Sequence, residues 1–370
     1  MKFSGRNNII EDILIRSNEP SYRRNQVFGA IYKGFVRTYS EITVLPKELR
    51  TTLSDKLEGE VSSLRIVSEI SDSQSQKVLF ETRDKERTEA VLMKFKANKD
   101  RRDEHESLCI SSQSGCAMGC KFCATGTIGF RKNLTTDEII DQILYFLRES
   151  NKIDSVSFMG MGEPLVNPNI FEALKVITDK DKLGFSQRRI SVSTVGIVPG
   201  IKRLQEEFPS VNLGFSLHSP FLEQRLALMP ITRVYLIKDV MSALKEYVEE
   251  TNKRVLIAYV LLADVNDTLD HARTLARLIK SQGAKNYLFE VKLIRFNPGS
   301  TTEHFERPAT ARIRAFQRVL NDFGIKNTLR QSFGLGISAA CGQLCAEIIK
   351  SGSLRNFAKN CIAWTNTDQS

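Results

Sequence analysis

The stretch Cys109-Ile-Ser-Ser-Gln-Ser-Gly-Cys116-Ala-Met-Gly-Cys120-Lys-Phe-Cys123-Ala-Thr-Gly126 organises the rest of the chain. Three of its cysteines, Cys116, Cys120 and Cys123, have Cys-x3-Cys-x2-Cys spacing. An iron–sulfur cube usually takes four thiolates from the protein, one for each iron. Three close thiolates without a fourth leave one iron open, as a catalytic zinc site keeps one position open for water or substrate. The spacing therefore predicts a 4Fe–4S cluster with an open iron.

Two other interpretations of these cysteines stay open. The first is a zinc site in which His105 is the fourth ligand, although a zinc ribbon requires a second Cys-x2-Cys pair downstream and none exists. The second is a group of buried structural thiols, because a free cysteine packs as a small hydrophobic residue.

Composition limits the class of protein. The chain has 370 residues, with 53 basic and 43 acidic side chains and a net charge of +10. This charge suits a polyanionic partner such as a nucleic acid but does not require one. No apolar run reaches the roughly 18 residues of a membrane span, and the N-terminus lacks the apolar region of a signal peptide. Seven clustered cysteines do not form an extracellular disulfide pattern. We expect a cytoplasmic protein.

The chain divides into four expected parts. Residues 1–70 are a small helical unit. Its residues Tyr22, Arg23, Arg24, Tyr32 and Lys33 are the mixture that RNA contacts use, although a plain solvated helix face accounts for them more simply. Residues 71–106 form a β-hairpin and a linker, with strands at 78–82 and 88–93 and a mobile charged loop at 94–106. Residues 107–345 form the core, and residues 346–370 form a C-terminal tail.

The core alternates strands and helices, which predicts an α/β fold with a parallel sheet. Thr135 and Glu138 form a capping box that opens its first helix. No phosphate-binding glycine fingerprint occurs early, so we expect a partial (β/α) barrel of the TIM type and not a dinucleotide-binding fold. The later elements are expected as strands at 155–159, 189–193, 211–216, 255–261, 288–294 and 326–330, and helices at 171–178, 200–208, 238–251, 271–282 and 310–323.

Polar groups follow several of these strands, at the edge where such barrels have their active sites. Gly160-Met-Gly162-Glu163-Pro164 follows the strand at 155–159, and its glycines let a ligand approach the backbone closely. The other strand-end groups are Ser193, the run Ser216-Leu217-His218, and Asn297. For His218, a structural hydrogen bond and a ligand contact remain equal alternatives.

These motifs resemble those of the radical S-adenosylmethionine (SAM) superfamily and, within it, the Cfr/RlmN family of ribosomal RNA methyltransferases. The resemblance extends over nearly the whole chain. It includes the N-terminal domain, 109–126, Phe158-Met-Gly-Met-Gly-Glu-Pro164, Ser216-Leu-His218 and Ala339-Ala-Cys341-Gly-Gln-Leu344. It implies a 4Fe–4S cluster on Cys116, Cys120 and Cys123.

The resemblance also implies roles for other residues. Cys341 carries a methyl group from one SAM, and a 5′-deoxyadenosyl radical from a second SAM activates that group for addition to adenine. Cys109 resolves the adduct by a transient disulfide with Cys341, and Glu89 accepts a proton. Cys345 and Cys361 have no matching role. The implied SAM contacts are Gly162, Glu163, Ser193, Ser216, Leu217, His218 and Asn297.

The resemblance further implies 23S ribosomal RNA as substrate, an electron donor such as flavodoxin or ferredoxin, and a monomer. Ser219, the run 293–297 and the run Gln331-Ser-Phe-Gly334 resemble the Cfr branch, which methylates carbon 8 of the adenine and confers resistance to ribosome-targeting antibiotics. The alternatives are carbon 2 methylation of the same adenine, a radical SAM enzyme with a non-RNA substrate, and a non-catalytic RNA-binding protein with a structural metal.

Overall fold

The computed structural model of the chain describes residues 5–97, 103–150, 152–299 and 303–344. Within these ranges, ten strands form one open sheet in the order β1-β2-β3-β4-β7-β8-β9-β10-β11-β12. Strands β1 to β4 pair antiparallel, and every pair from β4 to β12 is parallel. The strands are β1 Leu64–Ser71, β2 Ser75–Thr82, β3 Arg87–Phe95, β4 His105–Ile110, β7 Ser155–Phe158, β8 Ile190–Thr194, β9 Asn212–Ser216, β10 Val255–Leu261, β11 Phe289–Arg295 and β12 Asn327–Arg330.

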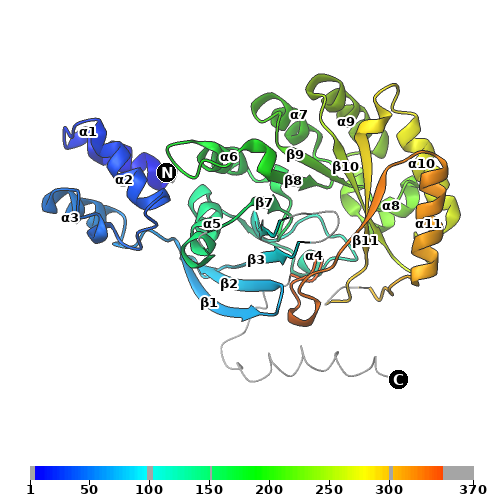
Figure 1. The fold of residues 1–370 in the computed structure, drawn as a ribbon, viewed down its shortest axis with the longest axis horizontal. Coiled ribbons are helices and arrows are strands. Elements are labelled where there is room, and N and C mark those ends of the chain that lie inside the picture. The colour runs from blue at the N-terminus through cyan, green and yellow to red at the C-terminus, as the bar shows by residue number, and fades with distance from the viewer. Residues whose placement is uncertain (1–4, 98–102, 151, 300–302, 345–370) are drawn as a thin grey trace.

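Helices connect the parallel strands and cover the outer side of the curved sheet, as Figure 1 shows for α7, α9, α10 and α11. Their apolar residues recur at helical spacing and are buried; in α10 these include Leu275, Ala276 and Ile279. The expected partial barrel is confirmed. The helices are α5 Thr136–Ser150, α6 Ile170–Thr178, α7 Val198–Glu207, α8 Leu222–Leu228, α9 Ile237–Thr251, α10 Leu269–Lys280 and α11 Thr310–Asp322.

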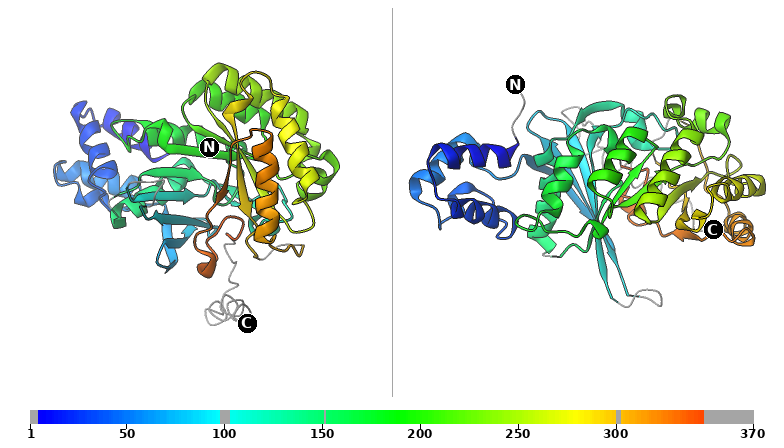
Figure 2. Two further views of the ribbon diagram at one scale, coloured as in Figure 1. Left: turned by 45° about the vertical axis from the view of Figure 1, so that its right-hand side comes forward. Right: turned by 90° about the horizontal axis from the view of Figure 1, so that it is seen from above.

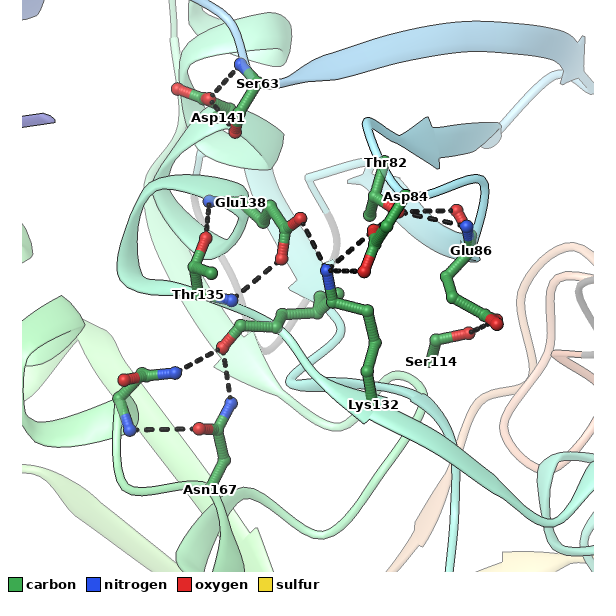
Figure 3. A network of polar contacts seen from close by, with 12 residues as sticks. Ser63, Thr82, Asp84, Glu86, Ser114, Lys132, Thr135, Glu138, Asp141 and Asn167 are labelled. Carbon is green, nitrogen blue, oxygen red and sulfur yellow. Dashed lines mark hydrogen bonds and ion pairs between the residues drawn. The ribbon is translucent and has the colours of Figure 1, made fainter. Parts of the chain in front are cut away.

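The N-terminal helices α1 (Arg6–Arg16), α2 (Tyr22–Tyr32) and α3 (Lys47–Lys56) lie together at one end of the molecule in all views (Figures 1 and 2). An ion pair joins them to the barrel. The guanidinium of Arg6 donates to Asp141 on α5 at 2.8 Å, and both side chains are buried. The other oxygen of Asp141 accepts bonds from the N–H and hydroxyl of Ser63, each at 2.7 Å (Figure 3).

The structure adds elements that the sequence patterns did not predict. Strand β1 begins at Leu64, within the expected helical unit, and only one of its eight residues is buried because it lies at the sheet edge. The polar run at 71–76 contains the end of β1, the turn and the first two residues of β2. Cys109, the first residue of the stretch that contains the three cluster cysteines, lies in β4 and precedes the cysteine loop. It is buried and pairs with Val91 and Ser157 in the ladder.

The expected mobile loop at 94–106 is partly strand, because β3 ends at Phe95 and β4 begins at His105. The rest of that expectation falls on residues 98–102, outside the described residues, as do Cys345, Cys361 and the 346–370 tail. No helix in the described ranges is long and apolar enough to cross a membrane.

We expect Asp141→Ala to destabilise the fold by about 3–5 kcal/mol, because it leaves the buried Arg6 guanidinium without its near partner. Urea denaturation measures this loss. Asp12→Ala is the matched control: Asp12 also lies 2.8 Å from an arginine, Arg16, but that pair is exposed, so its loss costs about 0.2–1 kcal/mol. Equal losses in the two variants would contradict the role of the buried pair.

Candidate active site

A short antiparallel pair closes the base of the cysteine loop. Strand β5 (Gln113–Gly115) precedes the three cysteines, and its partner β6 (Phe130–Asn133) follows them. A β-carbon on Gly115 would lie 1.8 Å from the carbonyl oxygen of Gly129, and Gly115 has a φ of +70°. Only glycine fits there. The close approach fixes the two ends of the loop together.

Charged side chains flank this base (Figure 3). Lys132 on β6 donates to Asp84 in the β2–β3 turn at 2.8 Å and to Glu138 on α5 at 2.9 Å. The expected capping box is present: Thr135 N–H donates to Glu138 at 2.8 Å, and the Thr135 hydroxyl accepts from Glu138 N–H at 3.2 Å. The loop is therefore held by the hairpin, by β6 and by the start of α5.

The three loop thiols fit an iron–sulfur cube. Burial, followed by repulsion from Cys123 and Glu163, raises the pKa of Cys116 to about 12. Burial is the largest cause that raises the pKa of Cys120, and the charges of Cys123 and Cys116 add to it. Burial also raises the pKa of Cys123. Bound irons would favour the thiolate form of these side chains, and a cube takes each thiolate on a separate iron. Among the residues that the structure describes, no three His, Cys, Asp or Glu side chains are grouped so that they could hold one metal ion.

His105, the alternative zinc ligand, lies at the far end of β4 from the cysteine loop. Its Nε2 atom bonds to the Ser155 hydroxyl at 2.9 Å, and its ring packs against Phe95 at 6.0 Å. Phe122, the aromatic residue before the third cysteine, is buried. It packs edge-on against His218 at 4.9 Å.

The glycine turn after β7 packs against the strand end that leads into the cysteine loop. A β-carbon on Gly160 would lie 2.6 Å from the Ser111 hydroxyl, and one on Gly162 would lie 2.5 Å from the Gln113 side chain. Gly162 also has a φ of +95°. The Met161 carbonyl accepts the backbone N–H groups of Ser112 and Gln113. Both glycines are thus required by close contacts within the protein.

Glu163 is buried in this turn and already has backbone partners. Its carboxylate oxygens accept the N–H groups of Leu165 at 3.1 Å and Val195 at 2.8 Å. Burial raises its pKa to about 7, against hydrogen bonds from Val195, Thr194 and Leu165 that lower it. The carboxylate links the turn after β7 to the end of β8.

The next two strand ends adjoin each other. The hydroxyls of Ser193 on β8 and Ser216 on β9 are 3.5 Å apart, and the Leu217 N–H donates to the Ala258 carbonyl on β10. His218 is buried, and its Nδ1 accepts the Val260 N–H at 2.9 Å. The proton of the neutral ring is therefore on Nε2. One ring nitrogen of His218 has a structural bond, and the other carries the proton and can act as a donor.

The segment with Cys341 is held against the cysteine loop. Ala124 N–H on α4 (Ala124–Ile128) donates to the Gly342 carbonyl at 2.8 Å, and the Thr125 hydroxyl donates to the Leu344 carbonyl at 2.7 Å. From the other side, the Asn297 side chain donates to the Cys341 carbonyl at 3.1 Å. Cys341 itself is exposed. It lines a pocket with Met93, Ile294, Asn297, 330–333 and 339–340.

Cys109 lies under this segment, in an apolar cluster that includes Val91, Met161, Phe333 and Ala339. Burial raises its pKa to about 11; the Arg330 charge opposes this, and a charge on Cys341 adds to it. A charge on Cys341 also raises the pKa of Cys123. Cys341 therefore lies within electrostatic range of both Cys109 and the cluster loop, and both Cys109 and Cys341 are free thiols.

Glu89 lies on β3, and its backbone carbonyl accepts the Ser111 hydroxyl, which in turn accepts the Met161 N–H of the glycine turn. Its carboxylate is buried and 3.4 Å from the ammonium group of Lys77 on β2. Lys77 also donates to the carbonyl of Ser338 at 3.3 Å, three residues before Cys341. Lys77 thus connects Glu89 to the Cys341 segment.

Sequence reasoning missed three side chains of this region. Gln113 accepts the Glu163 N–H at 2.9 Å, and Arg225 on α8 contacts the ends of β8 and β9. The guanidinium of Arg330 lies 3.5 Å from the sulfur of Met159. The backbone N–H of Met159 donates to the Cys109 sulfur. Gln113 lies within the quoted stretch and Arg330 in an expected strand, but no local pattern distinguishes them. Helix α8 was not predicted because it has only seven residues.

The chain is similar to proteins of known class. The radical SAM superfamily model matches residues 110–278. The ribosomal RNA large subunit methyltransferase Cfr of Staphylococcus aureus is 47% identical over 336 residues, 90% of this chain and 95% of that protein. Cfr of Bacillus velezensis is 45% identical over 343 residues, 92% of this chain and 97% of that protein. The crystal structure of a radical SAM methyltransferase from Sphaerobacter thermophilus matches with a TM-score of 0.84 at 38% identity, covering 92% of this chain and 98% of that one.

We expect His218 to stay neutral from pH 8 to pH 5, because burial, followed by the Arg225 charge, lowers its pKa to about 3. The unfolded chain binds this proton near pH 6.5, so His218 costs stability as the pH falls from about 6.5 toward 3. NMR of histidine-labelled protein tests this, with the signal assigned through His218→Gln. A His218 titration midpoint between pH 5 and pH 8 would contradict the expectation.

Proposed function

Because the chain belongs to the Cfr family of radical SAM ribosomal RNA methyltransferases, we propose that it methylates carbon 8 of an adenine in the peptidyl-transferase centre of 23S ribosomal RNA. Its cofactors are a 4Fe–4S cluster and SAM, which the superfamily requires. The observation that best supports the proposal is the placement of Cys341. It is an exposed thiol held between the helix that follows the cluster loop and Asn297.

We assign the cluster to Cys116, Cys120 and Cys123, and the SAM contacts to the strand-end groups. Glu163, with lone pairs left after its two backbone bonds, suits the SAM amino group. The polar contacts also include Ser193, Ser216, His218 and Asn297, with the backbone of Gly162 and Leu217. The cluster and SAM, when bound, supply the one-electron chemistry: abstraction of a hydrogen atom from an S-methyl group and return of the electron that the RNA adduct releases.

Cys341 is the proposed methyl carrier. An exposed sulfur in a pocket that also contains Asn297 and Arg330 is accessible to SAM and to a nucleotide in turn. Covalent attachment of the RNA carbon to this sulfur divides one difficult transfer into easier steps. Adenine ring carbons are weak nucleophiles, so a polar methyl transfer from SAM would not suffice.

Cys109 is the proposed resolving residue. Its thiolate supplies the electron pair of a new S–S bond to Cys341, and the pair of the broken bond between the Cys341 sulfur and the methylene carbon passes to that carbon. A proton then completes the methyl group. A thiol reductant afterwards reduces the disulfide. Hydrogen bonds from Ser157 and the Met159 N–H, together with the Arg330 charge, favour the thiolate against its burial.

Glu89 is the proposed proton acceptor for the hydrogen on the ring carbon. Its ion pair with Lys77 orients the carboxylate, and the Lys77 bond to the Ser338 carbonyl keeps it near the Cys341 segment. A buried carboxylate beside an ammonium group is a suitable base.

The choice of carbon 8 over carbon 2 rests on the residues that resemble the Cfr branch. Gln331, Ser332 and Phe333 line the same pocket as Cys341, and the Ser332 hydroxyl donates to the Asn297 side chain at 3.0 Å. Residues beside the carrier sulfur are in a position to orient the adenine. Methylation of carbon 8 implies resistance to antibiotics that bind the peptidyl-transferase centre.

We further propose that the enzyme acts as a monomer in the cytoplasm, with a flavodoxin or ferredoxin as electron donor. The N-terminal helices are proposed as an RNA-binding unit. Tyr22 is exposed there, and the guanidinium of Arg23 lies 5.1 Å from its ring centre. Such a pair suits stacking and phosphate contacts to RNA.

The product identifies the function. We expect 23S ribosomal RNA from cells that express this protein to yield 8-methyladenosine on digestion, identified by mass spectrometry against 8-methyladenosine and 2-methyladenosine standards. Cells that express Cys341→Ala are the control and should yield neither additional product. Recovery of 2-methyladenosine would instead assign carbon 2, and an unmodified RNA would contradict RNA methylation.

The two cysteines should fail at different steps. Cys341→Ala removes the methyl carrier, so neither protein methylation nor an RNA adduct should form. Cys109→Ala leaves the carrier intact but cannot resolve the adduct, so it should accumulate protein joined to RNA. Denaturing electrophoresis before and after nuclease digestion shows this species. Normal turnover by Cys109→Ala, or crosslinking by Cys341→Ala, would contradict these roles.

A further inference from the structure

Arg225 is a buried cation for which the proposed chemistry has no role. Its side chain is only 1% exposed. It donates to the carbonyls of Val195 at 2.8 Å, Ser216 at 3.1 Å and Leu217 at 3.0 Å, and to the Thr232 hydroxyl at 2.5 Å. A guanidinium has five N–H donors, so these four bonds leave one. All four acceptors are neutral.

The other fully buried arginine of the described chain shows how such a charge is ordinarily compensated. Arg6, 4% exposed, is 2.8 Å from one carboxylate of α5 and 4.0 Å from another. Arg225 has no carboxylate within 4.0 Å among the residues that the structure describes. A buried charge without a counter-charge is costly, so the anion near Arg225 has to be sought elsewhere.

The cysteine loop, which carries the three proposed cluster ligands, contacts the end of α8. The end of α8 is hydrogen-bonded to the loop, since the Lys121 N–H donates to the Leu228 carbonyl at 3.0 Å. Pro230, which follows α8, lies 3.9 Å from the position of a β-carbon on Gly119. Burial lowers the pKa of Arg225 to about 10, and a charge on Cys120 opposes this decrease.

We propose that Arg225 is a positioning residue that supplies a fixed positive charge beside the iron–sulfur cluster and raises the reduction potential of the cluster. The inference rests on the cluster itself and not on the carbon that is methylated. When an external reductant such as dithionite or a flavodoxin gives the cluster one electron, its negative charge increases by one. A fixed cation in a buried, low-dielectric environment stabilises that reduced state.

A purely structural role for Arg225 is the competing explanation, because its bonds tie the ends of β8 and β9 together. The two roles separate in two measurements on reconstituted protein: thermal unfolding, and the potential from a redox titration followed by electron paramagnetic resonance. Loss of structure lowers the unfolding temperature. Loss of charge shifts the potential of a cluster that remains bound.

The first pair of variants is Arg225→Met and Arg6→Met. We expect both to unfold at lower temperature, and only Arg225→Met to shift the cluster to a more negative potential. Arg6 is the matched control, because it is equally buried but bonds to the N-terminal unit and α5. A wild-type potential in Arg225→Met with its iron bound would overturn the proposal.

A second pair leaves Arg225 in place and decides the question if Arg225→Met does not assemble. Thr232→Asp puts a carboxylate beside the guanidinium and cancels its field, whereas Thr232→Asn places a neutral group of the same shape there. We expect a more negative potential in Thr232→Asp than in Thr232→Asn, at equal iron content. Equal potentials in these two variants would overturn the proposal whatever RNA product the enzyme makes.

Discussion

Two hydrogen bonds between distant parts of the chain hold the site together: Ala124 N–H to the Gly342 carbonyl and the Thr125 hydroxyl to the Leu344 carbonyl. They join residues that lie more than two hundred positions apart, and the second spans 219. The C-terminal segment is also anchored by Asn297, by Lys77 and by the apolar contacts of Phe333 and Ala339. The short helix α4 makes the first bond possible, because its first N–H groups have no partner within the helix. The tie brings the proposed methyl carrier to the cluster loop.

Much of the fold follows from local patterns. The parallel strands β7 to β12 and most of the helices between them were predicted, because continuous apolar runs and 3.6-residue periodicity show directly in the sequence. The capping box at Thr135 and Glu138 was predicted from its local Thr-x-x-Glu pattern. Strand β1 was missed because an exposed edge strand has little apolar alternation, and β5 and β6 were missed because such short strands depend on the closure of the loop.

The site was predictable in its parts and not in its connections. The cysteine spacing and the strand-end motifs mark candidate ligands, but the partners of Glu163 and His218 are backbone N–H groups that no motif encodes. The position of Cys109 in a strand, and the link from Glu89 through Lys77 to Ser338, depend on sheet register. A one-residue shift in that register would turn Lys77 and Cys109 to the opposite face.

The backbone constrains the two proposed reactive sulfurs to different degrees, because only Cys109 lies in a strand, β4. Cys109 is fixed in a ladder with neighbours on both sides, whereas Cys341 belongs to a segment with left-handed residues at Gly334, Ser338 and Gly342. A disulfide requires the two α-carbons to lie within about 7 Å. On the proposed mechanism Cys109 stays in its ladder, so the Cys341 segment makes the movement that forms the disulfide. The timing of product release then depends on the left-handed residues Gly334, Ser338 and Gly342 of the Cys341 segment. Substitutions there would alter the lifetime of the covalent intermediate without changing a reactive atom.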